Sequence, residues 1–166
     1  MSYIIKSGRC RGSQCKKIRR DRNTFYNVVS QAVGVDDAAL VLRRHAVQYI
    51  TKNWSRFAQY LKVDNASYCE YMEKEQPFAT RIEMQALAEM HKFQIILIER
   101  GDIISVINPN QEKQIAINTV FPNKMLLGNG DTHYDLVVKL VWNTTQGDRQ
   151  EVRNPGSVVK PDVILW

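Results

Sequence analysis

Residues 20–33 read RDRNTFYNVVSQAV, and the rest of the chain is organised around this stretch. Its apolar side chains recur every three or four positions, which is the spacing of one buried face of an amphipathic helix. Thr24 lies just before that face, where the helix is expected to begin. Backbone N–H groups converge at a helix start together with the positive end of the helix dipole. The Thr24 oxygen is therefore expected to act either as a helix cap or as a nucleophile.

The composition is that of an ordinary globular protein. The chain has 166 residues, of which 44% are hydrophobic and 24% charged, enough for one domain with its own core. The longest aliphatic run, residues 95–98, is far too short to cross a bilayer, so no membrane partner is expected. The N-terminus lacks the apolar core of a signal peptide, and the three cysteines form no framework spacing. These features favour a cytoplasmic location, with the nucleus as the alternative.

The net charge of +6 is concentrated at the N-terminus. Residues 1–22 contain eight Lys or Arg and a single acid, Asp21, whereas the rest of the chain carries a net charge of −1. Residues 1–20 are therefore interpreted as a basic N-terminal arm, and residues 1–22 could attract RNA or an acidic protein surface. A solvated, partly mobile terminus is the favoured interpretation, because no aromatic stacking residue is interleaved with the charges.

Hydrophobic periodicity predicts helices in the first half of the chain and strands in the second. The last helix begins with a capping-box pattern at Thr80 and Glu83. The first two strands are separated by a turn at Gly101, which predicts a hairpin. Helices are expected over residues 24–33, 39–52, 54–61, 67–75 and 80–91, and strands over residues 94–99, 103–107, 124–127 and 134–141.

Helices followed by strands predict an α+β fold with one small central sheet packed between helices. The globular domain is expected to span residues 21–142. Residues 143–166 form a polar tail, whose last segment is expected either to dock on the sheet or to mark where a longer protein was cut.

Three blocks of this sequence, in this order and spacing, resemble the OTU (ovarian tumour) family. They read DRNTFY over residues 21–26, FATRIEMQALA over residues 78–88 and GDTHYDLVV over residues 130–138. The family consists of papain-like cysteine proteases that remove ubiquitin. The resemblance covers nearly the whole globular part and implies a papain-like fold with ubiquitin, or a ubiquitin-like protein, as partner.

The resemblance also implies roles for individual residues. His133 matches the general base of the family. Asp135, two residues later on a strand, would lie on the same side of the sheet as His133 and orient it. Asp21 matches a second acid that the family can use to orient the histidine or to order the loop before the helix. Arg22 and Asn23 match the oxyanion loop.

Two departures from the family pattern concern the nucleophile. The family reads Asp-Gly-x-Cys in the first block, with the cysteine as nucleophile, whereas this chain has Arg22 at the glycine and Thr24 at the cysteine. A thiol ionises near neutral pH when paired with histidine, but an alcohol must lose its proton as it attacks. Threonine nucleophiles generally use their own free α-amine as base, and Thr24 is internal. Arg22 also lacks the conformational freedom of glycine. Both departures point away from hydrolysis.

The favoured hypothesis is therefore a deubiquitinase-like pseudoenzyme in which Thr24 caps the helix and the domain binds ubiquitin or serves as an interaction scaffold. The alternatives are an active isopeptidase that uses Thr24, His133 and Asp135, and an RNA-binding module built on the basic arm. No metal and no cofactor are expected, because Cys10 and Cys15 lack a second pair of ligands with zinc spacing.

Overall fold

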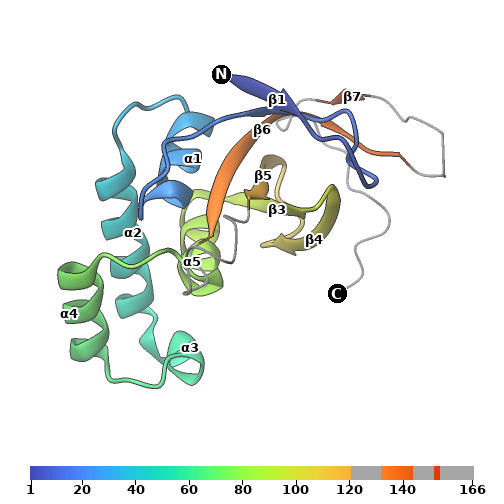
Figure 1. Cartoon of the computed structure of the whole chain (residues 1–166). Coiled ribbons are helices and arrows are strands. Elements are labelled where there is room, and N and C mark those ends of the chain that lie inside the picture. Colours follow the sequence, from blue (N-terminus) through green and yellow to red (C-terminus); the bar gives the residue numbers. More distant parts are fainter. Residues whose placement is uncertain (121–131, 144–151, 154–166) are drawn as a thin grey trace.

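The computed structural model describes residues 1–120 and 132–143, together with the backbone of residues 152–153 (Figure 1). The elements follow the order expected for an α+β fold, except that two short strands precede the first helix. They are β1 (Ser2–Ile4), β2 (Gln14–Lys16), α1 (Thr24–Ala32), α2 (Ala39–Lys52), α3 (Trp54–Phe57), the 3₁₀ helix η1 (Ala58–Tyr60), α4 (Asn65–Glu75), α5 (Arg81–His91), β3 (Phe93–Glu99), β4 (Asp102–Ile107), β5 (Lys113–Val120), β6 (His133–Val141) and β7 (Val152–Arg153).

The helices form close to where the periodic patterns predict them. The capping box of α5 is confirmed: the Thr80 hydroxyl accepts a hydrogen bond from the Ile82 N–H, and Glu83 accepts one from the Thr80 N–H at 2.8 Å. The helix expected over residues 54–61 is instead a short α-helix followed by one 3₁₀ turn, α3 and η1.

A mixed sheet is the centre of the molecule. Its described strands lie in the order β1-β2-β6-β5-β3-β4, and β7 pairs with the far end of β6. Strands β3 and β5 run parallel, whereas the other described pairs are antiparallel. The hairpin predicted at Gly101 is confirmed, because β3 pairs antiparallel with β4 across that turn. The α+β class with a central sheet flanked by helices is thus confirmed.

Three apolar clusters hold the described elements together, and the third packs α3 and α4 against α2 and α5. The largest cluster joins the buried faces of α1, α2 and α5 to β3, β5 and β6, and α1 packs directly on β6. The second cluster joins buried side chains of the N-terminal segment to the same strands and to Trp142. Figure 1 shows β1 and β2 at the edge of the sheet beside β6, and the chain after β2 continuing towards α1. The helices and the buried side chains of the N-terminal segment therefore both pack on the central strands.

The N-terminal segment is not the solvated, mobile arm that its charges indicate. Strand β2 pairs with β6 and β1 pairs with β2, so residues 2–16 extend the sheet. The reason is that apolar residues lie between the charges: Ile5, Cys10, Cys15 and Ile18 are all buried. The interpretation of residues 1–20 as a separate arm is wrong for this part of the chain.

Other differences concern the second half of the chain. Strand β5 was not predicted, although five of its residues, Gln114–Asn118, are buried. The strand expected over residues 124–127 lies outside the described residues, as does the end of the tail. Within the tail, residues 152–153 form β7. No helix in the described part of the chain has the length and apolar character needed to span a bilayer.

Two glycines fix the N-terminal segment against the β3–β4 turn. Gly8 and Gly101 have φ angles of 73° and 83°, in the left-handed region that favours glycine. The Cys10 N–H donates to the Gly101 carbonyl at 2.7 Å. A Cβ on Gly101 would lie 1.8 Å from the Ser7 carbonyl oxygen, so the two backbones approach too closely for any side chain.

We expect Gly101→Ala to lower the free energy of unfolding by about 2–4 kcal/mol, because it adds a backbone clash to the left-handed strain. Gly34→Ala is the matched control, since Gly34 has a φ of 74° but nothing within 4 Å of the added carbon. This control tests the backbone strain alone, and we expect it to lower the free energy of unfolding by about 1 kcal/mol. Urea denaturation of both variants measures these changes. Equal losses of unfolding free energy in the two variants would contradict the close approach of the two backbones.

Candidate active site

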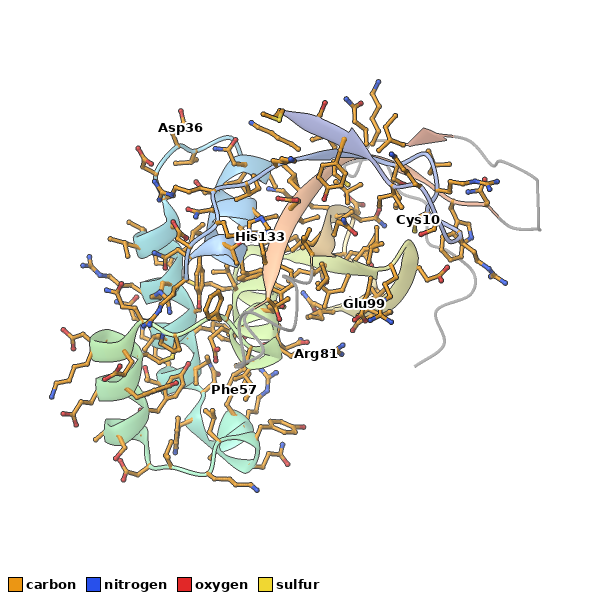
Figure 2. The ribbon with its side chains drawn as sticks, viewed as in Figure 1. Cys10, Asp36, Phe57, Arg81, Glu99 and His133 are labelled. Carbon is orange, nitrogen blue, oxygen red and sulfur yellow. The ribbon has the colours of Figure 1, made fainter. Side chains whose placement is uncertain are left out.

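Three polar side chains meet where the start of α1 faces the start of β6. The Thr24 Oγ1 lies 2.9 Å from His133 Nδ1, and His133 Nε2 lies 2.9 Å from Asp135 Oδ1. All three side chains are buried. His133 and Asp135 lie two residues apart on one strand and so share a face of the sheet. Because α1 packs on β6, its first residue reaches the imidazole, and Figure 2 shows His133 in this position.

The hydroxyl of Thr24 does not cap the helix. The N-cap residue of α1 is Asn23, and it makes no side-chain capping bond. The Thr24 oxygen instead accepts a hydrogen bond from the Tyr134 N–H at 3.1 Å and lies 3.0 Å from the Tyr134 carbonyl. Thr24 is 1% exposed. The predicted capping role is therefore wrong, and the hydroxyl is enclosed by polar groups of β6.

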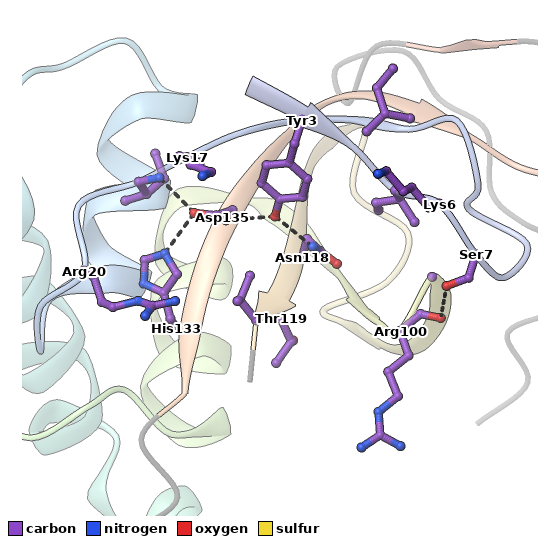
Figure 3. Close-up of a pocket in the computed structure, with 15 residues that line it drawn as sticks. Tyr3, Lys6, Ser7, Lys17, Arg20, Arg100, Asn118, Thr119, His133 and Asp135 are labelled. Atoms are coloured by element: carbon purple, nitrogen blue, oxygen red, sulfur yellow. Dashed lines mark hydrogen bonds and ion pairs between the residues drawn. The ribbon is translucent and has the colours of Figure 1, made fainter. Parts of the chain in front are cut away.

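The carboxylate of Asp135 collects three hydrogen bonds. Besides His133, it accepts one from the Ile18 N–H at 2.8 Å and one from the Tyr3 hydroxyl at 2.8 Å (Figure 3). Burial alone would raise the pKa of Asp135, but the hydrogen bonds from His133, Ile18 and Tyr3 outweigh it and hold the pKa below its usual value.

The charge of Asp135 fixes the state of His133. An ionised carboxylate only accepts hydrogen bonds, so the Nε2 that faces it carries the proton. In the neutral imidazole, Nδ1 is then an acceptor that points at the Thr24 hydroxyl. This is the arrangement in which a histidine could receive a proton from a nucleophile at residue 24.

Tyr3 extends the chain of hydrogen bonds into β5. Its hydroxyl donates to Asp135 and accepts from the Asn118 side chain at 2.9 Å. Burial, together with the neighbouring carboxylate, raises the pKa of Tyr3, so the phenol remains a donor. Sequence reasoning missed both residues, because Tyr3 lay in the expected arm and Asn118 in a strand that was not predicted.

Asp21 plays a different part from the one considered for it. Its carboxylate accepts hydrogen bonds from the Asn23 N–H at 2.8 Å and from the side chains of Asn27 and Arg19, and none from His133. Its carbonyl accepts the Thr24 N–H at 3.2 Å. Two backbone N–H groups of the loop before α1 therefore have partners within the loop.

A buried arginine holds this loop from behind. Arg43, on α2, donates twice to the Asn23 side chain and once each to the carbonyls of Arg22 and Pro77. Its guanidinium also lies 4.6 Å from the centre of the Tyr26 ring. The signal in the sequence is a basic residue on the apolar face of the helix predicted over residues 39–52. The Arg22 side chain donates to the Glu75 carbonyl at the end of α4, away from His133.

The cysteines offer no substitute for the residue at position 24. Cys10 and Cys15 are fully buried in the second apolar cluster. Burial raises the pKa of each thiol to about 12, so both remain protonated and unreactive at neutral pH. Within the described residues, no group of three or more His, Cys, Asp or Glu side chains is arranged to hold a metal ion.

Comparisons with known proteins identify one family along most of the chain. The OTU-like cysteine protease family matches residues 21–134. OTU domain-containing protein 5-A of Danio rerio is 28% identical over 134 residues, which cover 72% of this chain and 24% of that protein. The chain thus spans about a quarter of the length of this relative.

Solved structures share the fold at lower identity. The OTU domain of OTUD1 superimposes with a TM-score of 0.58 at 22% identity, covering 74% of this chain and 83% of that one. An OTU domain solved in complex with ubiquitin gives a TM-score of 0.59 at 18% identity, covering 84% of this chain and 73% of that one. At these identities the likeness concerns the fold.

We expect Asp135→Asn to lower the free energy of unfolding by about 2–3 kcal/mol at pH 7, because its amide group meets donors where the carboxylate accepts. Since the folded-state pKa of Asp135 is lowered, its contribution is complete above about pH 4 and is lost as the pH falls through the folded-state value. Urea denaturation between pH 2.5 and pH 7 should show that the difference in the free energy of unfolding between the wild-type protein and Asp135→Asn becomes smaller below about pH 4.

Asp36→Asn, in the exposed loop between α1 and α2, is the control for this titration and should change stability by less than about 0.5 kcal/mol. A loss at Asp135→Asn that stayed constant down to the lowest pH would contradict the assignment of an ionised, hydrogen-bonded carboxylate.

Proposed function

The chain belongs to the OTU-like cysteine protease family, and we propose that it is a silent or nearly silent member that still recognises ubiquitin or a ubiquitin-like protein. In this proposal Thr24 occupies the position of the nucleophile, His133 that of the base and Asp135 that of the orienting acid. Such a domain acts by binding its partner or by serving as a scaffold.

The observation that carries the proposal is the enclosure of the Thr24 hydroxyl. Its oxygen has polar neighbours in His133 and in both backbone groups of Tyr134, and the residue is 1% exposed. A nucleophile must present a lone pair to the substrate, but one lone pair of this oxygen is engaged by the Tyr134 N–H. The second lone pair has no donor among these contacts, so it is the burial of the residue that restricts the access of a substrate to this oxygen.

The chemistry of an alcohol supports the same conclusion. A cysteine paired with histidine is already a thiolate near neutral pH, whereas a threonine keeps its proton until the moment of attack. That step requires an oxyanion hole that stabilises the tetrahedral intermediate. The N–H groups of Asn23 and Thr24, which lie beside the reacting position, already donate to Asp21.

Recognition of ubiquitin rests on the family and on the fold. One OTU domain with the same fold was solved in complex with ubiquitin, which supports the same class of partner for this chain. Because the chain spans about a quarter of the length of its relative in Danio rerio, the proposal concerns this domain.

The second candidate is an active hydrolase, and one observation favours it. Thr24, His133 and Asp135 form an unbroken series of hydrogen bonds in the order that a serine-protease mechanism uses. This candidate requires turnover that depends on Thr24 and His133 and that falls as the imidazole is protonated at acid pH.

We expect the wild-type protein to leave di-ubiquitin uncleaved and Thr24→Cys to raise the rate at least about 100-fold above it, because a thiolate no longer needs to lose a proton during attack. The measurement is cleavage of a panel of di-ubiquitin linkages, together with calorimetric titration of mono-ubiquitin into the wild-type protein. Binding with a Kd below about 1 mM supports recognition.

Thr24→Ser is the matched control, because it removes the methyl group but keeps the oxygen, and it should remain silent. A second control, His133→Ala in the Thr24→Cys background, should abolish the gained activity. Robust wild-type turnover that Thr24→Ala abolishes would refute the loss of activity and establish the second candidate. Absence of ubiquitin binding would refute the recognition, whatever the catalytic result.

A further inference from the structure

A hollow of about 870 Å³ opens beside His133 and Asp135. Its lining comes from the N-terminal segment, from the β3–β4 turn and from the adjoining ends of β5 and β6 (Figure 3). Thr24 is not among the described residues that line it. The hollow is therefore a separate feature from the enclosed hydroxyl, although His133 and Asp135 border both.

The lining of the hollow carries a marked excess of positive charge. Lys6, Lys17, Arg20 and Arg100 all contribute to it, against one carboxylate, that of Asp135, among the described residues of the lining. That carboxylate already accepts three hydrogen bonds from within the fold. Cations gathered around a concave surface with protein walls focus a positive potential, which raises the local concentration of anions.

The basic residues of the N-terminal segment thus fall into two groups. Several are used within the fold: Lys16 donates to Gln31, Arg19 pairs with Asp21, and Arg22 donates to the Glu75 carbonyl. By contrast, the other five form no ion pair with any described residue: Lys6, Arg9, Arg11, Lys17 and Arg20. Three of these five, Lys6, Lys17 and Arg20, line the hollow together with Arg100 of the β3–β4 turn.

Both walls of the hollow are held in place. On one side, Tyr3 and the Ile18 N–H are bonded to Asp135, which fixes the segment that carries Lys17. On the other side, the close approach of Gly8 and Gly101 fixes Lys6 and Ser7 beside Arg100. A site that needs no reorganisation loses less free energy when a ligand is ordered on it.

The arrangement of the cations favours an extended ligand. Figure 3 shows Lys17 and Arg20 near His133, Lys6 and Arg100 at the other end, and Tyr3 and Asn118 between them. The lining also contains apolar groups, including Ile4, which is 56% exposed. A nucleic acid strand would need several aromatic faces on which successive bases stack, but Tyr3 is the one Phe, Tyr or Trp among the described residues that line the hollow.

We propose that this hollow binds an extended acidic peptide segment of a partner protein, with carboxylates at its two cationic ends and apolar side chains between them. This site goes beyond the ubiquitin-directed role, because it requires neither hydrolysis nor a nucleophile at residue 24. It gives the domain a second, charge-selective contact beside the His133–Asp135 pair.

The test is fluorescence anisotropy at 150 mM salt with a labelled peptide of sequence GEELEDLEEG and a second peptide in which every acid is replaced by its amide. The double variant Lys6→Glu/Arg20→Glu reverses a cation at each end of the hollow and should weaken binding of the acidic peptide at least about 10-fold. Lys52→Glu/Lys62→Glu is the matched control, with the same change of net charge at exposed sites outside the hollow, and should weaken it less than about 3-fold. Thermal unfolding of both variants verifies that the fold is kept.

Four results would overturn the proposal. Equal weakening by the two double variants, or equal binding of the amide peptide, would reduce the effect to general attraction by a basic protein. Tighter binding of a single-stranded RNA 12-mer with the same sensitivity to Lys6→Glu/Arg20→Glu would assign the hollow to nucleic acid. Displacement of the peptide by about 1 mM inorganic phosphate would assign it to a small anion. None of these results bears on ubiquitin cleavage or binding, so failure here is distinct from failure of the proposed function.

Discussion

The arrangement of the molecule depends on the hydrogen bonds that converge on Asp135. This carboxylate joins β1 through Tyr3, the segment after β2 through the Ile18 N–H, and its own strand through His133. A buried carboxylate without partners would cost several kcal/mol, so three donors must remain in place around it for the fold to be stable. The same three bonds orient the imidazole towards Thr24 and fix one wall of the cationic hollow. One constraint thus sets the geometry of both sites.

Local patterns were sufficient to predict the helices, the β3–β4 hairpin and the capping box at Thr80, because each depends on neighbours within a few residues. They failed for β5 and for the N-terminal strands. The sequence of β5, KQIAINTV, alternates weakly, because a strand that is buried on both faces need not alternate. At the N-terminus the many charged residues led to the prediction of a solvated arm, although Ile5 and Cys15 lie among them. The burial of these apolar residues depends on pairing with a strand more than a hundred residues later, which no local pattern shows.

The candidate site likewise contains residues that could be predicted from the sequence and residues that could not. The meeting of Thr24, His133 and Asp135 could be anticipated, because the resemblance to the OTU family implies that these positions share one site. The supporting residues could not. The position of Arg43 on the apolar face of its helix indicates burial but not its partners, which are Asn23 and the Arg22 carbonyl of the loop before α1. Such roles come from tertiary packing, which brings neutral acceptors around a buried charge, and no local pattern encodes them.

The intact pair of His133 and Asp135 does not by itself indicate catalysis. Both side chains are buried, and removing either would leave the other with an unsatisfied polar group, a loss of about 1–3 kcal/mol. A domain that no longer cleaved its substrate would therefore still be expected to keep them, for stability alone. Thr24 is different, because its hydroxyl can be satisfied by the backbone of Tyr134 without any chemistry. What distinguishes a silent site from a working one is therefore the atom at residue 24 and its access to substrate, and both the alcohol and its enclosure oppose attack.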